Sequence, residues 1–561
     1  MKRDIAALTA ERFDILVIGG GVHGAFAAWD AALRGLRVAL VERGDFGGGT
    51  SSNSLKIAHG GFRHLRNADL RALRASLDEQ IALQRIAPHL VRPLPCVMEA
   101  GHRLTRGSTL MGAALAFYRA ESRRRARRAG SERAPEMSVG GIVRGDALAR
   151  LVEPLESGWR AGAVWTDALI RSPERLMMGV LRAAVDAGAV ATSYVEARSL
   201  TPRDADIAVD VIGEECGPFT IRTRLVLDAR GPWTNQPIAQ SSIPQTRITE
   251  APLAQGSITR APLARACNIV VRAPIHPPRA AVAFPHPNEP RMLFAVPWRD
   301  RLMLGTTYHH AELSGDPRDD VDVERLVQLF DAALPGISLE RREVEFVHCG
   351  LLPAESSDDL PVKLRDRSAV VDWCAAWGID GIVSMLGVKW TTARAVAERA
   401  VDLCQAKLRL PVRPGGTDRR PIAGGETVEG AEDSAAHPAA DRVSHDCCAS
   451  GAPAVSFDRD LYGSLATEVA AIARQDPSLA IPLAPGSGVI GAQIAHAVRH
   501  EMALHLDDIV LRRSELGTAG MPSEAELSAA AQLAAAELGW SEARTADELA
   551  RVRGAYWWRC A

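Results

Sequence analysis

The chain has 561 residues, of which 47% are hydrophobic and 24% charged. At roughly 150 residues per domain, this length predicts three or four folded units. The composition excludes wholesale disorder, a coiled-coil rod and a collagen-like fibre. The 66 Lys and Arg residues balance 68 Asp and Glu residues, for a net charge of −2, so no overall field attracts nucleic acid. We therefore expect a soluble globular protein without a nucleic-acid partner.

The cysteine pattern and the first residues indicate in which cellular compartment the protein is expected. The nine cysteines fit neither a disulfide framework nor a zinc site. The first residues lack the apolar core of a secretion signal, and no apolar stretch of about 18 residues predicts a spanning helix. His437, His445, Cys447 and Cys448 lie near one another but lack a second ligand pair at zinc spacing, so we expect no metal. These features predict a cytoplasmic protein.

The segment after the charged leader has the pattern of a nucleotide-binding turn. Residues 13–18 (FDILVI) form an apolar run typical of a buried parallel strand, and the alanine-rich residues 25–33 predict a helix. Three glycines between them set the spacing G-x-G-x-x-G: Gly19, Gly21 and Gly24. Glycines let the backbone approach a pyrophosphate, whose charge is stabilised by the free N–H groups at the helix start.

An acidic residue completes this unit. A second strand, residues 37–41, ends at Glu42, which can accept hydrogen bonds from ribose hydroxyls. An acid at this place disfavours a 2′-phosphate, so the sequence predicts NAD or FAD rather than NADP. An NAD-linked dehydrogenase is an alternative that predicts no bound flavin.

The next segment favours FAD. Residues 47–63 (GGGTSSNSLKIAHGGFR) form a long glycine loop where a simple βα unit would follow in an NAD domain. Such a loop can lie along an extended FAD and reach its isoalloxazine end. Its hydroxyl and basic side chains are predicted to contact the cofactor: Thr50, Ser51, Ser52, Lys56 and His59.

The sequence resembles the FAD-dependent glycerol-3-phosphate dehydrogenase family of D-amino-acid-oxidase-like flavoproteins. The matching segments include VIGGGVHGAFAAWDAALRGLRVALVERGDF, TSSNSLKIAHGGFRHL, VLDARGPWTN, RMLFAVPWRDRLMLGTT, SMLGVKWTTARAVAERA and, near the end, HAVRHEMALHLDDIVLRRSELG. The resemblance implies an α/β FAD-binding Rossmann-like domain, an antiparallel β-sheet substrate domain and a C-terminal α-helical domain. We assign FAD-binding parts to 1–100, 166–240 and 371–410, a surface segment to 101–165, the substrate domain to 241–370, a linker to 411–455 and the helical domain to 456–561.

Two later strands are predicted to return to the cofactor. Residues 226–231 end in Gly231, and residues 381–387 end in Gly387, each a strand that runs into a glycine turn. Next to them, Lys389 and Thr391 are predicted to open a helix whose start stabilises negative charge on the flavin. Near the chain end, the charged residues are predicted to form surface and interdomain pairs: Asp507, Asp508, Arg512 and Arg513.

The substrate side departs from the family pattern. His64 follows Arg63 where the family has tyrosine, Tyr308 and Ala393 replace other family residues, and Leu352 replaces an arginine that is expected to contact the substrate phosphate. Leucine cannot make that bidentate contact. The remaining predicted substrate-binding residues are Arg63, His64, Arg365 and Lys389.

A short cationic segment supports an anionic substrate. Lys363, Arg365 and Arg367 alternate in PVKLRDR and would share one strand face. An anion site and a solvated strand face are both open there. His309 and His310 are further candidate donors.

The resemblance implies oxidation of a hydroxyl-bearing carbon by hydride transfer to flavin N5. The catalytic candidates are His59 as acid or base, Arg63 and Lys389. We expect a small anionic substrate, phosphate- or phosphonate-like, that has changed from glycerol 3-phosphate. A flavin-binding protein without turnover and an FAD-dependent amine or amino-acid oxidase are the alternatives.

The sequence also indicates which acceptor takes the electrons from the reduced flavin. It contains no second nucleotide fingerprint, haem motif or iron–sulfur pattern, which favours quinone or oxygen as the acceptor. The apolar residues 110–118 precede the arginine-rich residues 119–133, a pattern that can lie on an anionic membrane, with a solvated basic helix as the alternative. The predicted partners are therefore the substrate, the acceptor, the inner membrane face and a second copy in a homodimer.

Overall fold

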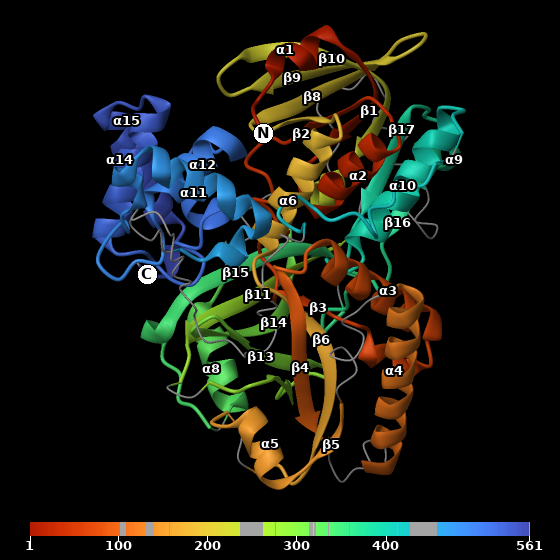
Figure 1. The fold of residues 1–561 in the computed structure, drawn as a ribbon. Helices are drawn as coiled ribbons and strands as arrows, with labels where there is room; N and C mark the ends of the chain where they lie inside the picture. Colours follow the sequence, from red (N-terminus) through yellow and green to blue (C-terminus); the bar gives the residue numbers. More distant parts are fainter. Residues whose placement is uncertain are drawn as a thin grey trace.

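The computed structural model has a nucleotide-binding part, a second sheet beneath it and a cluster of helices to one side (Figure 1). It describes residues 1–100, 108–130, 140–155, 158–235, 262–274, 277–312, 318, 321–334, 336–357, 359–411, 413–426 and 457–559. This arrangement confirms the predicted fold class, with an α/β Rossmann-like part, a largely antiparallel sheet and a helical C-terminal part.

The first sheet is built from three separated segments of the chain. Its strand order is β16-β17-β10-β1-β2-β7, with β17, β10, β1, β2 and β7 parallel to one another, β16 antiparallel to β17, and the β8–β9 ribbon extending β10. Parallel strands need crossovers, and the helices α2 Val22–Leu33, α6 Pro173–Asp186 and α10 Ala393–Lys407 pack together on this sheet. The strands are β1 Arg12–Ile18, β2 Val38–Val41, β7 Val190–Thr192, β8 Val195–Pro202, β9 Ile207–Gly213, β10 Gly217–Asp228, β16 Ala369–Asp372 and β17 Ile382–Leu386.

The second sheet lies below the first and is antiparallel except where β12 pairs with β4. Its order is β15-β11-β14-β13-β12-β4-β6-β3, with β5 on β6. The strands are β3 Ile57–Ala58, β4 Val91–Glu99, β5 Gly141–Val143, β6 Gly162–Ile170, β11 Leu263–Arg272, β12 Ala281–Pro285, β13 Met292–Trp298, β14 Arg301–Ala311 and β15 Val344–Pro353. The helices of this half are α3 Leu70–Ile86, α4 Ser108–Arg128, α5 Gly145–Val152 and α8 Val323–Ala333.

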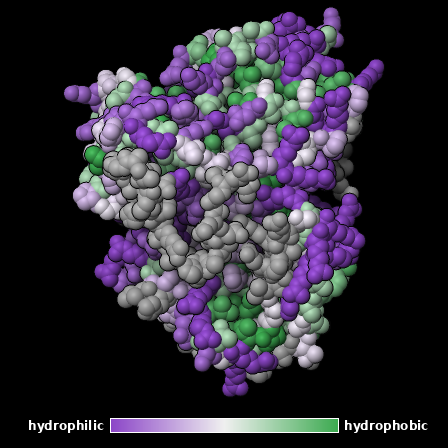
Figure 2. Space-filling model, in the orientation of Figure 1, coloured by the Kyte–Doolittle hydropathy of each residue, from purple (hydrophilic) through white to green (hydrophobic). Residues whose placement is uncertain are grey.

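The helical C-terminal part packs against both sheets. Its helices are α11 Ala466–Gln475, α12 Gly491–Glu501, α13 Leu506–Asp508, α14 Glu524–Leu538 and α15 Glu542–Gly554. The view in Figure 2 is mostly hydrophilic, and hydrophobic residues gather toward its lower end, where the second sheet lies in Figure 1. Among the described residues, no helix is both long and apolar enough to cross a membrane.

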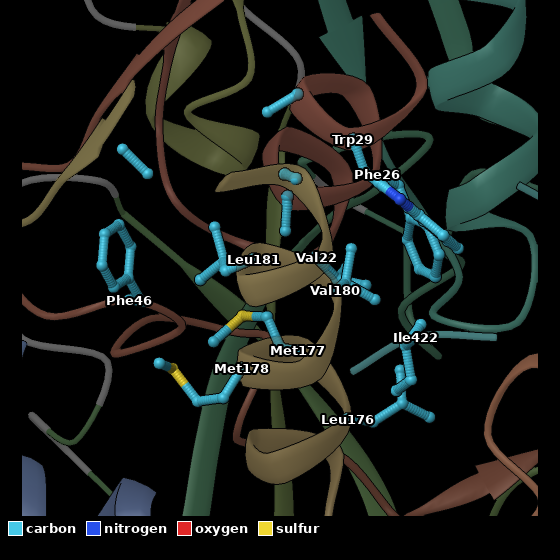
Figure 3. Packing of buried hydrophobic residues seen from close by; sticks show 14 of the residues in the cluster. Val22, Phe26, Trp29, Phe46, Leu176, Met177, Met178, Val180, Leu181 and Ile422 are labelled. Carbon is cyan, nitrogen blue, oxygen red and sulfur yellow. The ribbon is translucent and has the colours of Figure 1, made fainter. Parts of the chain in front are cut away.

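The core of the nucleotide-binding part joins α2 and α6. Phe26 and Trp29 of α2 and Leu176 and Val180 of α6 belong to one buried cluster (Figure 3). Each such side chain contributes roughly 1.5–3 kcal/mol by leaving water. Met177 of α6 also supports the cofactor loop, because a Cβ built at Gly47 would lie 2.2 Å from its Cε. The core therefore fixes the elements around the glycine turn.

Three local predictions differ from the structure. Residues 361–367 do not form a strand, so the expected common face of Lys363, Arg365 and Arg367 is wrong; only an isolated bridge, Ala354 to Leu364, occurs there. The last FAD-side helix begins at Ala393, which leaves Lys389 in the preceding turn. Strands β3, β4 and β6 join the second sheet although their ranges were assigned outside the substrate domain, because local sequence patterns do not identify strand partners.

Candidate functional site

The glycine turn between β1 and α2 leaves no room for side chains. Gly19 has a φ of +112°, and a Cβ at Gly24 would lie 1.9 Å from the carbonyl oxygen of Gly19. Gly21 caps the start of α2. These close approaches hold the backbone in a tight turn at the start of α2, and a glycine turn at a helix start is the kind of site that binds pyrophosphate.

Glu42 lies at the end of β2, as predicted, beside the turn. Its Oε2 accepts from the N–H of Gly20 at 2.7 Å, and its Oε1 accepts from the N–H of Gly44 at 2.9 Å. Burial raises the pKa of this carboxyl group. Each carboxylate oxygen keeps a further lone pair, which can accept from a ribose hydroxyl.

The loop that contains Thr50, Ser51 and Ser52 is hydrogen-bonded both to the start of α2 and to strand β15. Ser51 Oγ accepts from the N–H of Val22 at 3.0 Å, and the Ser51 carbonyl accepts from Trp390 Nε1 at 3.1 Å. Thr50 Oγ1 donates to the Leu351 carbonyl at 2.9 Å, and Ser52 Oγ donates to the Gly47 carbonyl at 2.7 Å. The side chains of the predicted cofactor residues Thr50, Ser51 and Ser52 therefore hold the loop in place.

Lys56 is deeper than the sequence indicates. Its side chain is fully buried, and its Nζ lies 3.1 Å from Glu174 Oε1 and 4.8 Å from the centre of the Trp298 ring. Burial lowers the pKa of Lys56. The ammonium group stabilises the end of the loop through this ion pair, so any effect of Lys56 on the cofactor in this arrangement is indirect.

His59 forms a pair with an aspartate that the sequence analysis did not identify. His59 Nδ1 lies 2.9 Å from Asp167 Oδ2, and the N–H of Gly60 donates to Asp167 Oδ1 at 2.8 Å. The imidazole is 47% exposed, whereas the carboxylate is buried. Asp167 thus orients the ring and leaves Nε2 to a ligand. In the sequence, Asp167 is distinguished only as the single acidic residue of the apolar strand β6. Its role becomes visible only in the fold, where β6 lies beside the loop that carries His59.

Two cations and a histidine gather at the other end of the loop: Arg63, Lys389 and His64. Burial, and then the charge of Arg63, lowers the pKa of Lys389 to about 8. Burial, and then Lys389 and Arg63, lowers the pKa of His64. Among the described residues, Arg63 forms an ion pair at the outer surface, where the exposed Asp366 lies 4.0 Å away. Repulsion among these cations favours an anion between them.

The remaining predicted cations are dispersed. Arg365 donates its backbone N–H to the Pro353 carbonyl at 3.0 Å, which holds it near the end of β15. Arg367 pairs with Asp69 at 3.3 Å. The Nε2 of His310 lies 2.9 Å from the Asp359 carbonyl. Of this group, only Arg365 stays close to β15, the strand that carries Leu352.

The roof strand β15 presents one face to the loop. His348 Nδ1 lies 3.3 Å from Asn53 Oδ1, and a Cβ at Gly350 would lie 3.0 Å from Thr50 Cγ2. Leu352 follows two residues later and shares this face, because side chains alternate along a strand. The position that lost the family arginine therefore belongs to the loop-facing side of the sheet.

The last predicted cofactor glycines lie at the ends of β10 and β17. Gly231 has a φ of +63° and begins a short 3-10 turn, Gly231–Asn235. Gly387 packs on the imidazole of His23, because a Cβ there would lie 2.0 Å from His23 Cε1. Burial lowers the pKa of His23 to about 4, and its buried Nε2 has no hydrogen-bond partner within the part of the chain that the structure describes. Thr391 is buried in the next turn.

These features fit FAD. The glycine cradle suits a pyrophosphate, the free lone pairs of Glu42 suit a ribose, and the unpartnered Nε2 of His23 adds a polar group at the helix start. In the described part of the chain, no group of three His, Cys, Asp or Glu residues is arranged to hold a metal ion. His437, His445, Cys447 and Cys448 lie outside the described residues.

Comparisons with known proteins agree with this geometry. A family model described as FAD dependent oxidoreductase matches residues 14–403, and one described as the C-terminal domain of alpha-glycerophosphate oxidase matches residues 416–545. A glycerol-3-phosphate dehydrogenase from Synechocystis sp. is 28% identical over 529 residues, covering 92% of this chain and 90% of the relative. Glycerol-3-phosphate dehydrogenase 2 from Mycobacterium tuberculosis is 30% identical over 565 residues, covering 97% of this chain and 89% of the relative.

Solved structures show the same fold. The glycerol-3-phosphate dehydrogenase from Bacillus halodurans complexed with FAD has a TM-score of 0.69 at 20% identity, covering 98% of this chain and 96% of the other. Glycine oxidase from Geobacillus kaustophilus has a TM-score of 0.50 at 17% identity, covering 73% of this chain and 98% of the other. The chain therefore belongs to the FAD-dependent oxidoreductase family, and within it to the glycerol-3-phosphate dehydrogenase-like members.

Proposed function

We propose that this enzyme oxidises the hydroxyl-bearing carbon of a small anionic substrate, phosphate- or phosphonate-like, and that its preference has shifted from glycerol 3-phosphate. The observation that carries the proposal is the depressed pKa of Lys389, about 8, caused by burial and by Arg63. Arg63 and Lys389 repel each other, and the exposed Asp366, 4.0 Å from Arg63, neutralises this charge only in part, so a bound anion is favoured. The names of the relatives supply the expectation of a hydroxy-phosphate.

The loss of one arginine supports a changed substrate. Leu352 shares the loop-facing side of β15 with Gly350. A charge-assisted hydrogen bond contributes about 1.5–3 kcal/mol, which corresponds to one to two decades of binding. Arg63, His64 and Lys389 are left to hold the anion, with Arg365 nearby. A substrate with a smaller or differently placed anionic group suits this set better than glycerol 3-phosphate does.

The protein's own residues would position the substrate and move its hydroxyl proton. When bound, FAD would supply the hydride acceptor for the substrate carbon. His59 presents Nε2 to take the hydroxyl proton, and Asp167 at 2.9 Å from Nδ1 holds the ring and stabilises its protonated form. The cations orient the anionic end of the substrate so that the hydroxyl meets His59.

An anaerobic spectral titration tests this proposal. The flavin-loaded enzyme is mixed with glycerol 3-phosphate, other hydroxy-phosphates, hydroxy-phosphonates and amino acids, and flavin bleaching is followed. We expect bleaching by an anionic hydroxy compound at lower concentration than by glycerol 3-phosphate. Efficient bleaching by glycerol 3-phosphate alone contradicts the changed preference, and bleaching only by amino acids contradicts the reaction class.

We further propose quinone or oxygen as the acceptor and α4 as a membrane contact. Leu110 and Phe117 of α4 are exposed by 62% and 41%, and Arg123, Arg127 and Arg128 are exposed on the same helix. Apolar and cationic side chains together favour an anionic bilayer surface. Flotation with anionic liposomes at low and high salt tests this contact, and absence of binding at low salt contradicts it. The cytoplasmic location stays a prediction.

A further inference from the structure

Asp45 lies in the loop directly after Glu42 and is held by the C-terminal domain. Arg513 Nη1 and Nη2 donate to its two carboxylate oxygens at 2.9 and 2.5 Å, and Arg512 Nε donates to the same group. The Asp45 side chain is only 1% exposed, and the Arg513 side chain is fully buried. Burial alone would raise the pKa of Asp45, but Arg513 and Arg512 outweigh it and lower the pKa to about 2.

The two arginines come from an unusual turn. Residues Ile509–Arg513 form a π-helical turn directly after α13. Such turns are rare and are frequent at functional sites. Here the turn brings two consecutive arginines onto one carboxylate. Arg512 Nη2 also donates to Asp507 at 2.9 Å and to Asp508 at 2.8 Å, which completes a buried charge network.

The Asp45 loop also braces the cofactor turn. Gly44 donates to Glu42 at 2.9 Å, and the N–H of Gly47 donates to the Gly20 carbonyl at 3.1 Å. The Phe46 ring is so close that a Cβ at Gly20 would lie 2.6 Å from it. The anchor at Asp45 therefore lies between the ribose-binding carboxylate and the backbone that supports the pyrophosphate turn.

We propose that Arg512 and Arg513 are positioning residues for FAD, through which the C-terminal domain sets the affinity of the nucleotide site. Without the clamp, the loop samples other conformations, and FAD binding has to order it. The coupling is reciprocal, so bound FAD also strengthens the contact between the C-terminal domain and the nucleotide-binding part.

The test is the dissociation constant of FAD for the full-length apoprotein, from the quenching of flavin fluorescence. Asp45→Asn and Arg513→Gln are expected to weaken FAD binding by roughly 5- to 150-fold. The matched control is Arg553→Gln, which breaks an exposed pair with Glu524 at 2.6 Å on the same domain and should leave the constant unchanged. In the combined Asp45→Asn/Arg513→Gln variant, FAD affinity should fall by less than the product of the two single fold-changes, because both substitutions remove the same contact.

A purely structural role would lower the apoprotein Tm without changing FAD affinity. The proposal is therefore overturned if folded variants bind FAD within about twofold of the parent. Because Asp45→Asn leaves buried arginine charge and can prevent folding, Arg513→Lys is measured as well. It keeps the charge but loses the two-pronged contact, so weaker FAD binding in this variant supports the clamp and an unchanged constant refutes it.

Discussion

Lys389 offers a sharp test of the anion site. Its pKa of about 8 means that about nine tenths of the side chain is protonated at pH 7 and about one tenth at pH 9. Deprotonation removes the charge that holds the substrate, so kcat/KM should fall as pH rises through about 8. Replacing Lys389 with methionine removes a contact of about 1.5–3 kcal/mol and should lower kcat/KM by about 10- to 150-fold.

The assay is a pH profile of kcat/KM under steady-state conditions. Lys389→Met should lose the basic limb near pH 8. In Arg63→Gln the limb should move to higher pH, because the charge of Arg63 is the second cause of the depressed pKa of Lys389. The control is Lys363→Met, whose side chain is 64% exposed and 3.9 Å from Asp359. A basic limb that is unchanged in Lys389→Met would refute the assignment.

Three further predictions concern proton transfer, specificity and cofactor binding. His59→Gln should slow single-turnover flavin reduction by about 10²- to 10⁴-fold, and Asp167→Asn should slow it as well, because the ring loses its orienting partner; unchanged rates remove the pair from the mechanism. Leu352→Arg should tighten glycerol 3-phosphate binding by about one to two decades, measured by spectral titration, and weaker binding would contradict the orientation of this strand face. Gly24→Ala should abolish FAD retention after gel filtration, because its Cβ would lie 1.9 Å from the Gly19 carbonyl oxygen; a yellow variant protein would show that the turn adapts.

Some elements of the site were predictable from local pattern. The strand β1, the glycine turn, the helix α2 and Glu42 follow one another within a short stretch, and the constraints on them are local. A glycine is required where a Cβ would strike the neighbouring backbone, as at Gly19 and Gly24. The clash at Gly24 is with the carbonyl oxygen of Gly19, a residue close in sequence, so the spacing reveals it; at Gly19 a Cβ would instead lie 2.7 Å from the carbonyl oxygen of Ala229, which only the fold brings near.

Other features depend on which segments meet. Asp167 pairs with His59 across 108 residues of chain, and Asp45 meets Arg513 across 468. Lys56 looked like an open cofactor contact, yet Glu174 and Trp298 enclose it. The cationic segment at residues 361–367 reads as a strand, but it has no continuous partner to form one.

The sequence by itself determined the nucleotide-binding turn, because backbone sterics and hydrophobic periodicity act over a few residues, and its resemblance to a known family implied the fold class. Only the tertiary structure decided which cations surround Lys389, which acid orients His59 and which domain holds the loop after Glu42. Electrostatic interactions depend on distance and burial in space. Positions along the chain do not specify either quantity, so pKa values and charge partners emerge only once the sheets and the C-terminal helices pack together.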